Sequence, residues 1–152
     1  MTLDEFDLNI LRHLQADGRI TNQALAARCH LSPAACHERV RRLRERGVIQ
    51  GYAALIDPRA IARGLLIFVE VKLDRTTGDL FAAFAEAARR TPEILECHMV
   101  AGGFDYLIKA RLADMDAYRS FLGEVLVQMP GVRETRTYAV LEEVKNTVRL
   151  PL

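Results

Sequence analysis

Arginine side chains are concentrated in one short part of this 152-residue chain. Residues 28–46 contain six arginines and two glutamates, a local charge of +4, whereas residues 61–152 carry −1 and the whole chain only +1. A guanidinium group donates hydrogen bonds in a planar fork that fits phosphates and guanine edges. The arginine-rich part therefore has two interpretations: a surface for a polyanion, or a solvated helix face kept soluble by glutamate–arginine pairs.

Three short helices are predicted to position these arginines. The first is closed by Gly18, the second begins after the N-cap Thr21, and the third begins after Ser32, with Pro33 at its first position, and ends at Gly47. A tight turn joins the second helix to the third, which is typical of a helix-turn-helix whose later helix enters the major groove of double-stranded DNA. The first helix carries an apolar stripe at helical spacing: Leu3, Phe6, Ile10, Leu11 and Leu14.

One side of the third helix is predicted to face the DNA. At roughly 100° per residue, Cys36, Val40 and Leu43 share the side that packs on the first two helices, and Arg41 lies opposite. Glu38, on the same outer side, could accept from cytosine or merely orient an arginine. Small side chains would allow close approach, and a helix N-terminus suits a phosphate. The expected DNA-contact residues are Thr21, Asn22, Ser32, Ala34, Ala35, His37, Glu38, Arg41 and Arg42.

The rest of the chain alternates strand-like and helix-like segments. Strands are predicted at 48–56, 65–73, 94–100, 104–112 and 133–141, with amphipathic helices at 80–88 and 118–129. From residue 65 on, the order β-α-β-β-α-β is that of a ferredoxin-like domain, so the predicted fold class is α+β. We expect a DNA-binding domain at 1–50, a linker strand and hinge at 51–64, and a ferredoxin-like domain at 65–152.

Other chemistries have weaker support in the sequence. Each cysteine precedes a histidine, at 29–30, 36–37 and 97–98, but adjacent helical residues point about 100° apart, so no metal site is expected. No nucleophile–base set or phosphate loop stands at motif spacing, so the chain is not expected to be an enzyme or to hold a cofactor. Three widely spaced cysteines, no membrane-length apolar run and no leader pattern predict a cytoplasmic protein that makes no membrane contact.

A set of short motifs occurs in order along nearly the whole chain. The motifs are Leu31-Ser32-Pro33, residues 38–43, 47–51, 102–107, 130–132 and 135–138, and Glu142-Glu143-Val144-Lys145. Together they resemble the Lrp/AsnC family of feast/famine transcriptional regulators. The resemblance implies a winged helix-turn-helix domain, a linker strand and a C-terminal domain that dimerises and binds an amino acid. It also implies that dimers assemble further, commonly into octamers, and that the target genes serve amino-acid metabolism.

The resemblance further implies an effector site near the hairpin at 102–106, between subunits. Backbone N–H groups there could bind the carboxylate of an amino acid, Asp105 could accept from its ammonium group, and apolar residues could select leucine or another apolar side chain. Gly103 stands where the family usually has an aspartate. The expected effector-binding residues are Met99, Gly102, Gly103, Phe104, Asp105, Tyr106, Met115, Tyr138, Ala139 and Val140.

Three alternatives stay open at this point. The glycines of the hairpin could serve only its turn geometry, with the methionines and tyrosines filling a dimer core. The protein could be a DNA-binding regulator that needs no effector, because the aspartate is missing at position 103. It could also be an amino-acid-sensing module that acts on a partner enzyme, although that role leaves the arginine-rich helix without a purpose.

Overall fold

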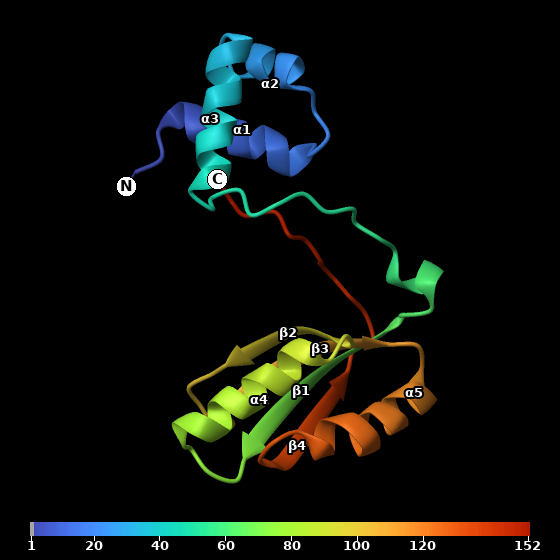
Figure 1. Ribbon diagram of the computed structural model, residues 1–152. Helices are drawn as coiled ribbons and strands as arrows, with labels where there is room; N and C mark the ends of the chain where they lie inside the picture. The colour runs from blue at the N-terminus through green and yellow to red at the C-terminus, as the bar shows by residue number, and fades with distance from the viewer. Residues whose placement is uncertain (1) are drawn as a thin grey trace. The chain divides into compact units, whose positions relative to one another are not determined.

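The computed structural model describes residues 2–152 (Figure 1). They form two compact units, each with its own buried core: residues up to Leu55 together with Lys145–Leu152, and Ile56–Val144. This division differs from the expected one in two places: residues 145–152 lie in the first unit, and the expected linker at 51–64 is divided between the two units. No helix within the described range has the length and apolar character needed to cross a membrane.

Three helices build the first unit: α1 (Glu5–Ala16), α2 (Asn22–Arg28) and α3 (Pro33–Glu45). Each begins after an N-cap whose side chain accepts a backbone N–H bond: Asp4, Thr21 and Ser32 respectively. The predicted helices are confirmed, and so is the inward direction of the predicted apolar side of α3. The core, at most 2% exposed, consists of Ile10, Leu25, Ala26, Cys29, Cys36 and Leu43.

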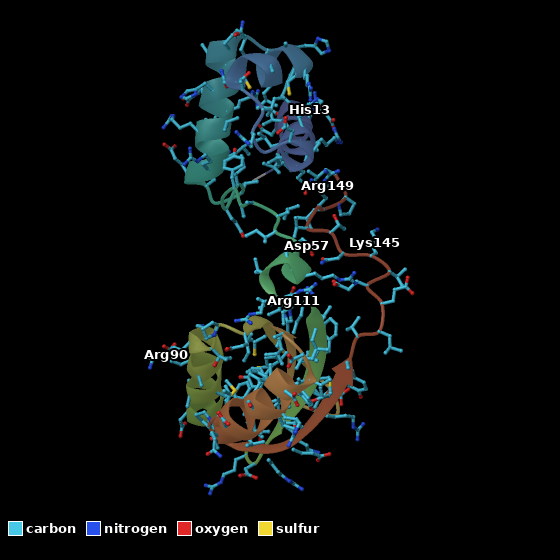
Figure 2. All side chains as sticks on the ribbon, turned by 90° about the vertical axis from the view of Figure 1, so that its right-hand side faces the viewer. His13, Asp57, Arg90, Arg111, Lys145 and Arg149 are labelled. Atoms are coloured by element: carbon cyan, nitrogen blue, oxygen red, sulfur yellow. The ribbon has the colours of Figure 1, made fainter. Side chains whose placement is uncertain are left out.

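The C-terminal segment lies along α1. Gln15 Nε2 donates to the Leu150 carbonyl (3.0 Å), Gln15 Oε1 accepts from the Leu150 N–H (2.6 Å), and Arg12 Nε donates to the Leu152 carbonyl (3.1 Å). Figure 2 labels Lys145 and Arg149 on this segment. Leu150 is still 71% exposed. Hydrogen bonds from side chains to the backbone therefore hold the segment, with little apolar packing.

The second unit is a four-stranded antiparallel sheet with helices on one face (Figure 1). The strands pair in the order β2-β3-β1-β4, so the predicted ferredoxin-like fold is confirmed. Along the chain the elements are η1 (Pro58–Ile61), β1 (Leu65–Leu73), α4 (Gly78–Arg90), β2 (Ile94–Met99), β3 (Tyr106–Leu112), α5 (Met115–Ser120), η2 (Phe121–Val125), η3 (Leu126–Gln128) and β4 (Val132–Ala139).

The two faces of the sheet have different surroundings. Ile67, Val69 and Val71 of β1 belong to the core that the helices cover and are at most 1% exposed. Phe68 points to the other face, because side chains alternate along a strand, and β1 pairs it with Lys109 on one side and Tyr138 on the other. Tyr138 is 46% exposed. This second face, the open face of the sheet, is therefore available for association around Phe68 and Tyr138.

A strand predicted at 48–56 is absent from the structure, so that prediction is wrong for this chain. Residues 50–57 have no regular structure. Tyr52, Leu55 and Ile56 are 51%, 83% and 63% exposed. A strand requires a partner for its backbone hydrogen bonds, and no other part of the described chain pairs with this segment.

The predicted helix at 118–129 changes its hydrogen-bonding pattern along its length. It starts as α5, widens into the π-helical η2 and ends as the 3-10 turn η3. A regular helix would place residues five apart on very different faces. The wider turn, in which the Leu126 N–H also bonds to the Phe121 carbonyl, lets Phe121 and Leu126 both be buried.

Candidate nucleic-acid interface and effector site

The outer side of α3 presents polar and small residues to solvent. Ser32 Oγ accepts from the Ala35 N–H (3.2 Å), and Thr21 Oγ1 accepts from the Ala24 N–H in the same way (3.2 Å). The Ser32 hydroxyl keeps its own proton, which can donate to a phosphate at the N-terminus of α3. Of the predicted DNA-contact residues on α3, the structure exposes all: Ala34, Ala35, His37, Glu38, Arg41 and Arg42.

Asn22 has a contact that fixes the helix-turn-helix. Its Nδ2 donates to the Pro33 carbonyl at 2.8 Å, which ties the start of α2 to the start of α3. The side chain is half-buried. Asn22, predicted as a DNA contact, therefore has a structural role in orienting α3.

Three residues on the exposed side of α3 form an ion-pair cluster, which we call the Arg41 cluster. Arg41 donates from Nε and one terminal nitrogen to the two oxygens of Glu38 (2.9 and 2.6 Å) and from its other terminal nitrogen to Glu45 (2.5 Å). The hydrogen bond from Arg41 lowers the pKa of Glu38, and the same bond with Glu38 is the largest cause that raises the pKa of Arg41. Glu38 and Arg41 are therefore charged at neutral pH.

Arg39 is turned toward α1 instead of toward the exposed side of α3. It donates to Asp4 (2.7 Å) and Asp7 (2.8 Å) and lies 5.3 Å from the centre of the Phe6 ring. Hydrogen bonds from the Asp7 N–H and from Arg39 lower the pKa of Asp4, and the bonds to the two aspartates raise the pKa of Arg39. Sequence reasoning missed this contact, because the aspartates three residues apart at the helix start indicate only the capping box between Asp4 and Asp7.

Asp105 anchors the predicted effector hairpin to β1. One oxygen, Oδ2, accepts from the Leu73 N–H at 2.7 Å, and the Asp105 N–H donates to the Val71 carbonyl at 2.9 Å. The bond to Oδ2 satisfies the backbone N–H of Leu73, at the point where the pairing of β1 with β4 shifts register. A half-buried carboxylate with one oxygen engaged can still accept from a ligand ammonium through the other.

The hairpin backbone at Gly102 and Gly103 is open. A Cβ added to either glycine would have no neighbour within 4 Å, and neither residue has a positive φ angle. Both are exposed. The alternative that these glycines serve only turn geometry is therefore not supported, because the backbone conformation accepts other residues.

Tyr106 belongs mainly to the core of the second unit. It is 3% exposed, its hydroxyl donates to the Phe81 carbonyl (3.3 Å), and its ring lies 4.5 Å from that of Phe84. Burial raises the pKa of this hydroxyl. Tyr106 also lines a shallow groove of about 330 Å³ between α4 and β2, together with Cys97, and no other predicted effector residue lines that groove.

The predicted effector residues fall into two groups at opposite ends of β1. Met99 and the hairpin lie near Val71 and Leu73, whereas the Val140 N–H bonds to the Leu66 carbonyl. Six residues of strand, about 20 Å at roughly 3.3 Å per residue, lie between Leu66 and Leu73. Three of these residues lie near the Leu66 end: Ala139, Val140 and Met115, the last of which follows β3. Tyr138 lies next to them on the open face.

Within residues 2–152, no group of three or more histidine, cysteine, aspartate or glutamate side chains is arranged to hold a metal ion. Cys29 and Cys36 are buried in the core of the first unit. Burial raises the pKa of both thiols. They contribute as small apolar residues.

Two family models match the chain. Residues 66–150 match the Lrp/AsnC ligand binding domain, and residues 3–50 match a winged helix-turn-helix DNA-binding model. The chain is 54% identical over 148 residues to the leucine-responsive regulatory protein of Escherichia coli K12. The aligned residues cover 97% of this chain and 90% of that protein. The elements of the second unit from β1 to β4 thus correspond to the matched ligand-binding domain.

Solved structures of transcriptional regulators have the same fold as this chain. A transcriptional regulator from Neisseria meningitidis, in complex with L-Met, has a TM-score of 0.93 at 39% identity, over 99% of this chain and 97% of that one. The leucine response regulatory protein of Mycobacterium tuberculosis has a TM-score of 0.80 at 35% identity, over 95% and 96%.

Proposed function

Because this chain belongs to the Lrp/AsnC family of transcriptional regulators, we propose that α3 binds double-stranded DNA and that leucine or a similar apolar amino acid adjusts this binding. The family makes the protein a regulator with a DNA-binding and an amino-acid-binding domain, not an enzyme. Genes of amino-acid metabolism are the proposed targets. The proposed place of action is the cytoplasm.

The exposed side of α3 is the observation that supports DNA contact. It carries Arg41 and Arg42 opposite an inner side on which Cys36 and Leu43 are buried, within a stretch of charge +4. Such a stretch attracts the phosphate backbone, and side chains from the same helix can reach base edges. Thr21, Ser32 and the small Ala34 and Ala35 complete the proposed contact surface.

The separation of the effector residues supports a site made by two subunits. A single amino acid cannot span about 20 Å, so the hairpin of one copy would need the Leu66 end of another. In this arrangement the backbone of Gly102 to Phe104 would bind the carboxylate, Asp105 would accept from the ammonium group, and Met115 and Val140 would meet the apolar side chain.

Two surfaces support assembly of several copies. The open face of the sheet carries the half-buried Phe68 and the exposed Tyr138, and residues 50–57, which have no regular structure, expose Leu55 and Ile56. We propose a two-fold dimer that associates further, to an octamer. A dimer would place two copies of α3 about 34 Å apart, which suits nearly palindromic sites.

The purified full chain can be tested by light scattering with each of the twenty amino acids, together with DNA-binding titrations at two salt concentrations. We expect a discrete oligomer that binds DNA with a steep salt dependence and responds to leucine or a similar amino acid. A response requires that the ligand prefer one assembly or DNA-bound state. DNA binding without any response would overturn the effector role, and absence of DNA binding would overturn the regulator itself.

A further inference from the structure

The Arg41 cluster does little for the stability of α3. Exposed ion pairs contribute little because water solvates the separated charges well, and fixing three long side chains costs rotamer entropy. The three side chains are 50–57% exposed. The other side of α3 is held independently by the buried Cys36 and Leu43. The cluster therefore does not hold α3 in place, and its effect falls on the outer surface of the helix.

The charge of the cluster argues against a phosphate as its target. One guanidinium faces two carboxylates, Glu38 and Glu45, so the cluster carries −1. A phosphate that approaches Arg41 would also approach both carboxylates and would be repelled by them. Arg42, in contrast, forms no ion pair within residues 2–152.

The remaining hydrogen-bond donors fit a base edge. A guanidinium has five N–H groups, and three of those on Arg41 donate within the cluster, which leaves two. Two N–H groups are what an arginine uses in a bidentate contact with O6 and N7 of guanine. Because the carboxylates fix the plane of the guanidinium, little further ordering is needed when it meets the base.

We infer that Glu38 and Glu45 are positioning residues that direct Arg41 to a guanine edge instead of the phosphate backbone, which makes Arg41 a specificity-determining residue. This inference rests on the proposed DNA binding by α3. Of the two roles that the sequence left open for Glu38, it selects the orientation of an arginine. Phosphate attraction then comes from neighbouring arginines such as Arg42.

The first test compares Arg41→Ala with Arg42→Ala. Each full-length variant is titrated with a duplex selected by the wild-type protein from a randomised pool, and with a scrambled duplex, over a range of salt concentrations. Arg41→Ala should weaken binding to the selected duplex about 5- to 150-fold, with little change on the scrambled duplex or in the salt slope. Arg42→Ala should weaken both and lower the salt slope by about one.

Arg41→Lys separates charge from geometry. It keeps the positive charge and removes the planar fork. We expect it to lose discrimination as Arg41→Ala does, while the salt slope stays at the wild-type value. Equal losses on both duplexes for Arg41→Ala, with a lower salt slope, would make Arg41 a phosphate contact and overturn the inference.

The positioning role is tested with Glu38→Gln and Glu45→Gln. Each substitution keeps the shape of the side chain and releases part of the guanidinium, so affinity for the scrambled duplex should rise and the ratio of selected to scrambled affinity should fall. Glu5→Gln, which removes one negative charge from α1, should leave this ratio unchanged. An unchanged ratio in both glutamate variants would overturn the positioning role, whereas a wild-type protein that binds neither duplex would overturn the proposed function.

Discussion

The residue at position 103 separates two interpretations of the hairpin. The family resemblance implies an aspartate there, and this chain has a glycine whose backbone is open on the side where a Cβ would be. Its φ angle is not positive, so an L-residue can take its place without strain. The missing carboxylate is therefore a chemical difference of the site and is not imposed by the fold.

Substitution Gly103→Asp is expected to add an acceptor for a ligand ammonium group without destabilising the protein. We expect an affinity for leucine several-fold higher in calorimetric titration, because the hydrogen bond to a charged group is stronger than one between neutral groups. Gly102→Ala, which meets equally open space, is the control for a change in the hairpin alone. Unaltered leucine affinity in Gly103→Asp would place the ammonium group elsewhere.

Asp4 is a second residue whose charge has a measurable consequence. Its pKa is lowered in the folded protein by the Asp7 N–H and by Arg39, so its contribution to stability is present above the unfolded value of about 3.9 and is lost as the pH falls through the lower folded value. The melting temperature of the three-helix unit should therefore fall as the pH is lowered from about 5 to about 3.

Asp4→Asn tests this dependence while it keeps the helix cap, because asparagine is as good an N-cap as aspartate. We expect the melting temperature of the variant to depend less on pH in the acid range, as followed by circular dichroism. Glu5→Gln, at the neighbouring residue, should keep the wild-type dependence. The same acid dependence in Asp4→Asn as in the wild type would show that Arg39 and the cap do not depend on this charge.

At the scale of elements, local signals were sufficient for most helices and strands. The N-caps Thr21 and Ser32, and the alternation from Leu65 to Leu73, act through neighbouring residues, and the structure has each element where these signals place it. The strand predicted at 48–56 fails because pairing needs a partner strand that this chain does not offer. The π-helical turn at Phe121 likewise depends on packing against the sheet, which periodicity does not describe.

The turn before β4 gives a prediction about the second unit. Gly131 has φ +71°, and a Cβ there would lie 2.5 Å from Leu80 Cδ2. Gly131→Ala should lower the free energy of unfolding by about 2–4 kcal/mol, because backbone strain adds to overpacking. Gly47→Ala, with φ +70° and no neighbour within 4 Å, should cost only about 1 kcal/mol.

Denaturant unfolding, followed separately for each unit, measures both substitutions. Gly47 lies after α3 and Gly131 before β4, so each variant reports on its own unit. Equal losses in the two variants would mean that Leu80 moves aside at no cost and that the positive φ angle alone sets the effect of Gly131→Ala.

At the scale of the whole molecule, the first unit is assembled from both ends of the chain. The C-terminal segment lies on α1 through Gln15, which bonds to both the N–H and the carbonyl of Leu150. No pattern in the sequence predicts the contacts at Leu150 and Leu152, because they use the backbone of the segment and not its side chains. These hydrogen bonds join residues that are separated by 133 to 140 positions in the sequence.

Gln15→Ala is expected to release the segment. The Leu150 amide loses its acceptor, so its hydrogen exchange, measured by NMR, should accelerate about tenfold. Gln23→Ala on α2 makes the same chemical change in the same unit and should leave this exchange rate as in the wild type. A Leu150 amide that exchanges equally fast in all three proteins would mean that the segment is not held on α1 in solution.

The effector site also belongs to this scale, because the resemblance collects residues that one chain keeps about 20 Å apart. Asp105→Ala and Met115→Asp each damage one of the two groups, so either variant alone should lose leucine binding.

The two variants can be co-expressed with different tags and purified as mixed dimers. These dimers should recover about half of the wild-type sites, since one of their two sites combines an intact hairpin with an intact Leu66 end. Val127→Asp, at an exposed position of the same helical run, is the control for added charge and should bind normally. If each site were formed within one chain, every site in the mixed dimer would carry a substitution and none would bind leucine. Mixed dimers that show no leucine binding in calorimetry would therefore contradict a site shared between subunits.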